Sequence, residues 1–167
     1  LVLTGLLIGG CATTTVGTLH YPAADNRSKI ILVALDGTGN TAVSRTNAAR
    51  LYEAFEANAL AGDRPVATYY SEGVGSRGDL PGLAAGNGIS ADVRQAYDFL
   101  TRTYRPGDDL IFTGFSRGAY AARILGGLIA IGGIPDLRNR PKSERARFIA
   151  HLYSVYKNSQ GLRTKEI

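Results

Sequence analysis

The segment Gly114–Gly118 carries the residues of this chain best suited to chemistry. It reads GFSRG, the G-x-S-x-G spacing of a nucleophile elbow, and lies between the apolar run LIFT and a helical pattern. A sharp strand-to-helix turn strains the central residue, so Gly114 and Gly118 must be small. The turn would place the Ser116 hydroxyl at the carboxyl end of a sheet, above the positive end of the following helix. We therefore predict that Ser116 is a catalytic nucleophile; the alternative is a glycine-rich turn with Ser116 as an ordinary helix N-cap.

A serine nucleophile also needs two N–H donors that converge on the oxyanion. One is expected from the backbone of Arg117, directly after the serine. The other is expected from the loop LDGTGN at residues 35–40, where Gly37 and Thr38 follow an apolar strand. Asp36 would hold this loop by accepting backbone N–H groups, or help to build the site. On local chemistry alone, DGTGN is also simply a good turn.

The elements around these residues alternate between strands and helices. The run IILVAL at residues 30–35 is continuously apolar, which is typical of a strand buried on both faces. This order predicts an α/β fold with three layers (α/β/α) and a mostly parallel sheet. The expected strands are 30–35, 66–70 and 110–113, and the expected helices are 47–60, 90–104 with Ser90 as N-cap, 117–131 and 143–157.

A glycine-rich stretch at residues 73–88 contains six glycines. Its spacing matches neither a phosphate-binding loop nor a dinucleotide fingerprint. We interpret it as a rim or lid segment of the site, with a flexible connection as the alternative.

The amino-terminal segment resembles a secretory signal that lacks its start. Residues 1–12 read LVLTGLLIGGCA, an apolar run too short to span a bilayer and followed by small residues. Gly10-Cys11 resembles a bacterial lipobox, so we expect residues 1–11 to be a truncated lipoprotein signal and Cys11 to be lipidated. Ala12 favours the outer membrane, and residues 12–28 would form a linker. The alternative is an ordinary small, buried cysteine.

Composition excludes several classes of protein. A hydrophobic content of 44% with 20% charged residues is ordinary for a globular chain. A single cysteine excludes a disulfide framework and a cysteine-cluster zinc site. We expect no metal and no cofactor. The net charge of +5 lies in residues 136–167, which hold 8 basic and 3 acidic residues. That segment is either a solvated face or a patch for anionic groups; without interleaved aromatics, no nucleic-acid partner is expected.

The motifs together resemble a known family. ALDGTGN, YYSEGVGS and GFSRGAYAAR resemble the α/β-hydrolase family of type VI secretion phospholipase effectors and related bacterial and fungal domains, over residues 28–156. The resemblance implies a serine lipase, phospholipase or esterase with a lipid or other ester substrate. It places the nucleophile at Ser116, and it matches Asp36 and Gly37 to the family's DGT turn. Leu35 stands where the family usually has Phe.

The catalytic acid and histidine are not evident. In α/β hydrolases both follow the nucleophile, and here the downstream candidates are Asp136 and His151. We expect His151 to lie on a helix face and His20 to lie in the linker, neither being catalytic. Residues 29–167 would then be the amino-terminal part of a hydrolase domain, inactive by itself, with acid and histidine supplied by later sequence. The alternative is a non-catalytic envelope lipoprotein that keeps the fold for binding.

Overall fold

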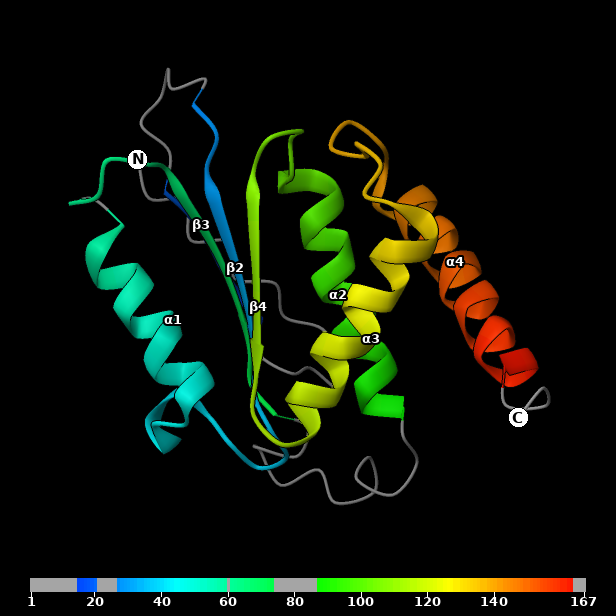
Figure 1. Ribbon diagram of the computed structural model, residues 1–167, viewed down its shortest axis with the longest axis horizontal. Coiled ribbons are helices and arrows are strands. Elements are labelled where there is room, and N and C mark those ends of the chain that lie inside the picture. The colour runs from blue at the N-terminus through cyan, green and yellow to red at the C-terminus, as the bar shows by residue number, and fades with distance from the viewer. Residues whose placement is uncertain (1–14, 21–26, 60, 74–86, 164–167) are drawn as a thin grey trace.

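The computed structural model describes residues 15–20, 27–59, 61–73 and 87–163. From the second strand its strands and helices alternate along the chain, and a last helix follows directly after another; Figure 1 shows their arrangement. The strands are β1 (Thr15–His20), β2 (Ile30–Leu35), β3 (Val66–Ser71) and β4 (Asp109–Gly114). The helices are η1 (Ala42–Ser44, a 3₁₀ turn), α1 (Asn47–Asn58), α2 (Asn87–Thr103), α3 (Arg117–Gly132) and α4 (Lys142–Arg163).

The described strands form one sheet in the order β1-β3-β2-β4. β2 pairs in parallel with both β3 and β4, and the register sets Leu35 opposite Ser71 on one side and Gly114 on the other. The carboxyl ends of the three parallel strands therefore meet at one edge of the sheet. This register brings the loop after β2 and the turn after β4 side by side.

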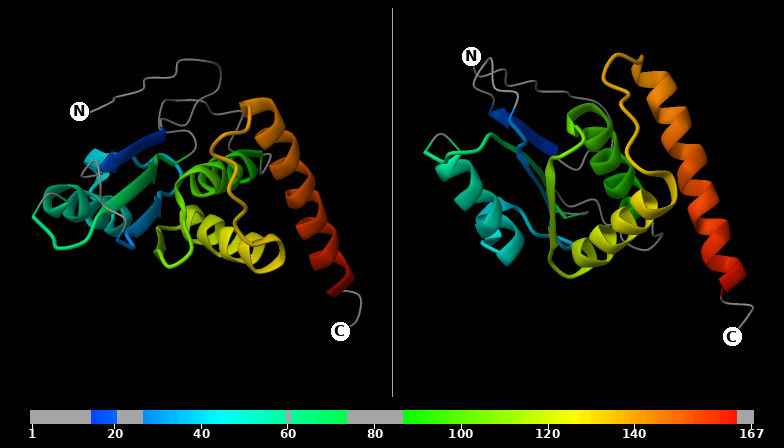
Figure 2. Two further views of the ribbon diagram at one scale, coloured as in Figure 1. Left: turned by 90° about the horizontal axis from the view of Figure 1, so that it is seen from above. Right: turned by 45° about the horizontal axis from the view of Figure 1, so that its top comes forward.

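Helices cover both faces of the sheet. α1 lies on one face, α2 and α3 lie on the other, and α4 packs outside α2 and α3 (Figures 1 and 2). This is the α/β/α layering expected from the alternation of elements, and the fold is α/β-hydrolase-like as predicted.

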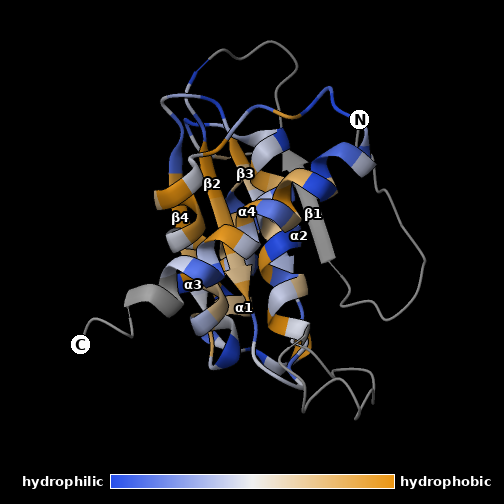
Figure 3. Ribbon diagram, turned by 90° about the vertical axis from the view of Figure 1, so that its right-hand side faces the viewer, coloured by the Kyte–Doolittle hydropathy of each residue, from blue (hydrophilic) through white to orange (hydrophobic). Residues whose placement is uncertain are grey.

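The core divides along the alternation of side chains in β2. Ile31, Val33 and Leu35 face the larger cluster, which includes Tyr97 of α2 and Leu125 of α3. The intervening residues Leu32 and Ala34 face α1 and pack with Tyr70. β2 is thus buried on both faces, as its apolar run predicts. Figure 3 shows the hydrophobic strands enclosed by helices whose outer surfaces are more hydrophilic.

Two local features differ from the sequence prediction. Residues 12–28 were expected to be a linker, whereas Thr15–His20 forms strand β1, antiparallel to β3 at the sheet edge. An edge strand is specified mainly by backbone pairing. The segment TVGTLH has no strict alternation of apolar residues from which a strand could be predicted. Ser90 is not the N-cap of α2, because the helix begins at Asn87; its hydroxyl instead shares a hydrogen bond of 3.0 Å with the Tyr153 hydroxyl.

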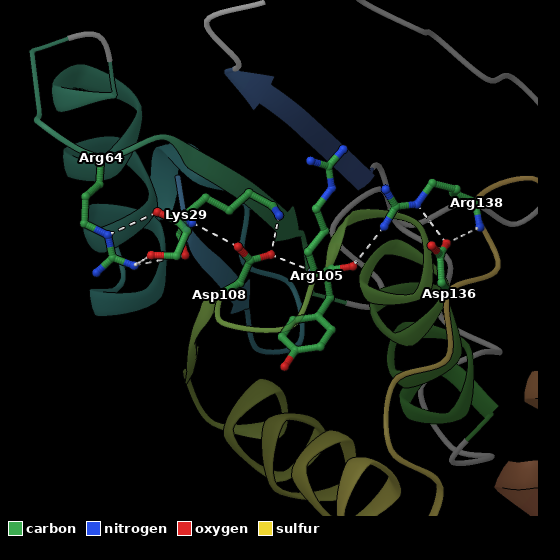
Figure 4. Close-up of polar contacts among 8 residues, drawn as sticks. Lys29, Arg64, Arg105, Asp108, Asp136 and Arg138 are labelled. Carbon is green, nitrogen blue, oxygen red and sulfur yellow. Dashed lines mark hydrogen bonds and ion pairs between the residues drawn. The ribbon is translucent and has the colours of Figure 1, made fainter. Parts of the chain in front are cut away.

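The edge of the sheet at which the parallel strands begin, the amino edge, carries structural ion pairs. Lys29, which is buried, forms an ion pair with Asp108, and its backbone N–H donates to the same carboxylate over 2.9 Å (Figure 4). Arg138 donates to Asp136 over 2.8 Å and to the Tyr104 carbonyl over 3.2 Å. These contacts place Asp136 at the end of the molecule opposite the carboxyl edge.

Candidate active site

Ser116 occupies the turn between β4 and α3 in an unusual backbone conformation. Its φ is 52° and its ψ is −119°, and it is exposed. Positive φ is uncommon for a residue with a side chain, and such strain persists where the surrounding structure enforces it. The turn is closed by the Gly118 N–H, which donates to the Phe115 carbonyl over 2.9 Å.

Close backbone packing explains the two glycines that flank Ser116. A Cβ atom on Gly114 would lie 2.4 Å from the carbonyl oxygen of Gly118. A Cβ atom on Gly118 would lie 2.1 Å from the carbonyl oxygen of Leu35, at the end of β2. Both distances are far shorter than any van der Waals contact, so these positions accept only glycine. The G-x-S-x-G spacing is therefore required by the packing of β2, β4 and α3.

The loop after β2 folds against Ser116. The Asn40 N–H donates to the Gly37 carbonyl over 3.0 Å, and Gly39 has a φ of 74°, as a type II turn requires of its third residue. A Cβ atom on Gly37 would lie 2.9 Å from the Cβ of Ser116. The two motifs are thus in direct contact, although α1, β3 and α2 lie between them in the sequence.

The carboxylate of Asp36 holds this loop in place. It is buried and accepts hydrogen bonds from the Gly37 N–H (3.0 Å), the Thr46 hydroxyl (2.7 Å) and the Tyr70 hydroxyl (2.7 Å). Thr46 also caps α1 by accepting from the Ala49 N–H over 3.1 Å. Burial, together with the hydrogen bond to Asp36, raises the pKa of Tyr70 well above its usual range. Asp36 thus ties β2, β3 and α1 together beneath the turn.

The backbone donors near Ser116 differ in their availability. Arg117 is the first residue of α3, and the first amides of a helix have no partner within it. The Gly37 amide is engaged by Asp36. Within the described part of the chain, the Thr38 amide does not donate to any backbone carbonyl in this loop. Arg117 and Thr38 are therefore the two candidates for a backbone N–H donor beside Ser116.

Neither histidine of the chain is near Ser116. His151 is exposed on α4, as expected, and its neighbour Leu152 contacts Gly132 at the far end of α3. The 16 residues of α3 separate that end from Ser116 by about 24 Å. His20 pairs with Val66, the first residue of β3, at the amino edge of the sheet. Asp136 lies at that edge as well.

Sequence reasoning missed several contributors to this site. Tyr70 was expected only as a strand residue and Thr46 was not singled out, yet both donate hydrogen bonds to Asp36. Gly73 packs directly on the Gly37 carbonyl, and its N–H donates to the Asn40 carbonyl over 2.9 Å. The pattern YYSEGVGS was noted only for its resemblance, and its role becomes clear from these contacts. Cys11 lies outside the described residues.

Two classes of feature are absent from the part of the chain that is described. No group of three or more His, Cys, Asp or Glu residues there could hold a metal ion. None of the helices described combines the length and apolar character that crossing a bilayer requires.

A mostly parallel sheet between layers of helices, with a strained serine at a strand-to-helix turn, is consistent with the α/β-hydrolase-like class. Residues 29–166 match the family model of the type VI secretion system (T6SS) phospholipase effector Tle1-like catalytic domain. The match spans most of the chain, so the chain belongs to this family. Membership assigns it to bacterial phospholipase effectors, hydrolases whose substrates are lipids. No curated protein and no solved structure matches the chain significantly.

Proposed function

We propose that this chain carries the nucleophile of a serine hydrolase that cleaves carboxylic ester bonds in lipids, with Ser116 as the attacking residue. The observation that carries the proposal is the positive φ of Ser116. This exposed serine lies at the start of α3 and contacts the turn at Gly37. A strained, exposed serine beside backbone N–H groups supports acyl transfer better than it supports helix capping, because Ser116 makes no side-chain cap bond.

The proposed reaction proceeds through an acyl-serine. Ser116 Oγ bonds to the ester carbonyl carbon while its proton passes to a base. The N–H groups of Arg117 and Thr38 stabilise the oxyanion, while Gly37 allows the turn to approach Ser116 closely. The base then protonates the departing alcohol as the C–O bond breaks. Water hydrolyses the acyl-serine by the same sequence of steps and releases the fatty acid.

We infer that the base and its acid come from sequence outside this chain. His151 and His20 lie away from Ser116, and Asp136 is at the opposite edge of the sheet with its carboxylate bound to Arg138. Asp36 is fully engaged in holding the turn. Asp36 thus acts as a positioning residue rather than as the acid of a triad.

Hydrolysis of phospholipid vesicles by the natural protein tests this function. Ser116→Ala is expected to lower the rate by about 10³-fold or more without loss of folding, because the covalent step is removed. Ser143→Ala, an exposed serine at the start of α4, is the matched control and should hydrolyse at the parental rate. An unchanged rate in Ser116→Ala would remove Ser116 from the mechanism.

We further propose that Cys11 is lipidated and anchors the protein to the cell envelope, at the outer membrane. The support is its position at the end of an apolar segment after two glycines. Metabolic labelling with a fatty-acid analogue should tag the natural protein, and Cys11→Ser should lose the tag. Release of an unlabelled parent protein into the periplasm would contradict the anchor.

A further inference from the structure

A polar groove of about 380 Å³ lies between α2 and α4, apart from the Ser116 turn. The two helices are joined on either side of Arg94: Ser90 bonds to Tyr153 over 3.0 Å, and Arg145 forms an ion pair with Asp98 over 2.7 Å. These two contacts run in opposite directions along the sequence, so the helices are antiparallel. They hold the groove walls at a fixed spacing.

The groove is lined by hydrogen-bond donors and two cations. Arg94 and Lys157 contribute the charges, and the remaining polar lining residues are Ser90, Tyr153, Ser154 and Asn158. The Arg94 Nε donates to the Ser90 carbonyl over 3.0 Å, which fixes the guanidinium group at the groove. Among the described residues that line the groove, none is acidic. Arg94 belongs to α2 and Lys157 to α4, so each wall of the groove carries one positive charge, and two like charges favour an anion between them.

Arg94 and Lys157 differ in their pairing from three arginines at residues 138–145. Arg138, Arg140 and Arg145 pair with Asp136, Glu144 and Asp98 respectively. Within the described ranges of the chain, neither Arg94 nor Lys157 forms an ion pair. No described carboxylate therefore neutralises Arg94 or Lys157, which leaves both cations able to bind an anion at the groove.

Ser90 and Arg94 of the groove lie in the first turns of α2, which begins beside the carboxyl edge of the sheet. The Ser71 hydroxyl, at the carboxyl end of β3, donates to Asp92 over 3.3 Å and holds the first turns of α2 at that edge. We propose that the groove binds a phosphate group, as inorganic phosphate or as the phosphodiester of a lipid headgroup. Arg94 supplies a planar pair of donors, Lys157 a point charge and the hydroxyls further hydrogen bonds. This binding does not require Ser116 to be the nucleophile.

The test compares two double variants of the natural protein with equal changes in charge. Arg94→Gln/Lys157→Gln alters the groove, and Lys142→Gln/Arg147→Gln alters two exposed residues of α4 outside it. Binding is measured by calorimetric titration with inorganic phosphate and by sedimentation with vesicles of ether-linked phosphatidylglycerol, which an ester hydrolase does not consume. Thermal unfolding checks that each variant is folded. If the double variant Arg94→Gln/Lys157→Gln does not fold, the single variant Lys157→Gln is used in its place.

The groove variant is expected to lose at least about tenfold in affinity, since each charge-assisted hydrogen bond is worth a factor of that order, while the control retains parental affinity. Loss of phosphate binding in the groove variant identifies a soluble phosphate site. Loss confined to the vesicles identifies the lipid headgroup as the source. Absence of binding to both probes, or equal loss in the two variants, overturns the proposal.

Discussion

The backbone of Ser116 shows how a residue's role depends on its neighbours. Its positive φ is enforced by Gly114 and Gly118, which allow β2, β4 and α3 to approach so closely that no Cβ fits. Strain of this kind costs of the order of 1–3 kcal/mol and is kept where the surroundings over-determine it. The glycines and the serine therefore form one structural unit.

Substitution of Gly118 by alanine tests this unit. The added Cβ would overlap the Leu35 carbonyl, so we expect Gly118→Ala to lower the free energy of unfolding by about 2 kcal/mol or more. Gly126→Ala is the control in the same helix. An added Cβ there has open space, so its free energy of unfolding should rise by about 1 kcal/mol from helix propensity. Equal effects of the two substitutions, measured by urea unfolding, would show that the close approach is wrong.

Tyr70 is the second residue whose contacts define a prediction. Tyr70→Phe removes the hydroxyl that donates to the buried Asp36 carboxylate and leaves Thr46 as its remaining side-chain partner. We expect the free energy of unfolding to fall by about 1.5–3 kcal/mol, the range for hydrogen bonds to charged groups. In the natural protein, lipid hydrolysis should show a lower kcat with little change in KM, because the Gly37 turn is less well fixed. A changed KM with an unchanged kcat would argue against this positioning role.

At the scale of elements, patterns within one segment predicted strands and turns, whereas contacts between distant segments could not be predicted. The apolar run at residues 30–35 specifies β2, because burial on both faces leaves it no polar position. The G-x-S-x-G turn was equally readable, because its glycines are a local steric need. Strand β1 and the Asp36–Tyr70 bond depend on pairing across 34 or more residues. No local periodicity encodes such contacts.

The junction of α2 with the end of α3 gives a pH-dependent prediction. The buried Tyr97 of α2 donates to the Gly133 carbonyl over 2.7 Å, and burial raises the pKa of Tyr97 to about 12. The unfolded tyrosine ionises near pH 10, so the folded state favours the protonated form. Its stabilising contribution is complete below pH 10 and is lost as the pH rises through 12. The stability difference between the parent and Tyr97→Phe should therefore narrow from pH 10 to pH 12.

Urea unfolding at pH 8, 10, 11 and 12 measures that difference. Tyr120→Phe is the control, because Tyr120 is exposed. A difference between the parent and Tyr97→Phe that stays constant over this range would show that the Tyr97 hydroxyl is not protected by burial.

At the scale of the whole molecule, the sheet places all the proposed reaction donors at one edge and both histidines away from it. The 167-residue chain alone should therefore show little hydrolysis of short-chain esters. Without a base, about 10³–10⁴-fold acceleration over water remains from oxyanion stabilisation and binding. Turnover by this chain that disappears in His151→Ala would contradict the placement of His151 at the far end of α3.

The central claim is that Ser116 is the nucleophile, and covalent labelling tests it most directly. A fluorophosphonate probe reacts with an activated serine hydroxyl and marks the residue that performs acyl transfer. In the natural protein, peptide mapping should locate the label at Ser116. Ser116→Ala should not be labelled, while Ser143→Ala should be labelled like the parent. Equal labelling of the parent and of Ser116→Ala would contradict the account.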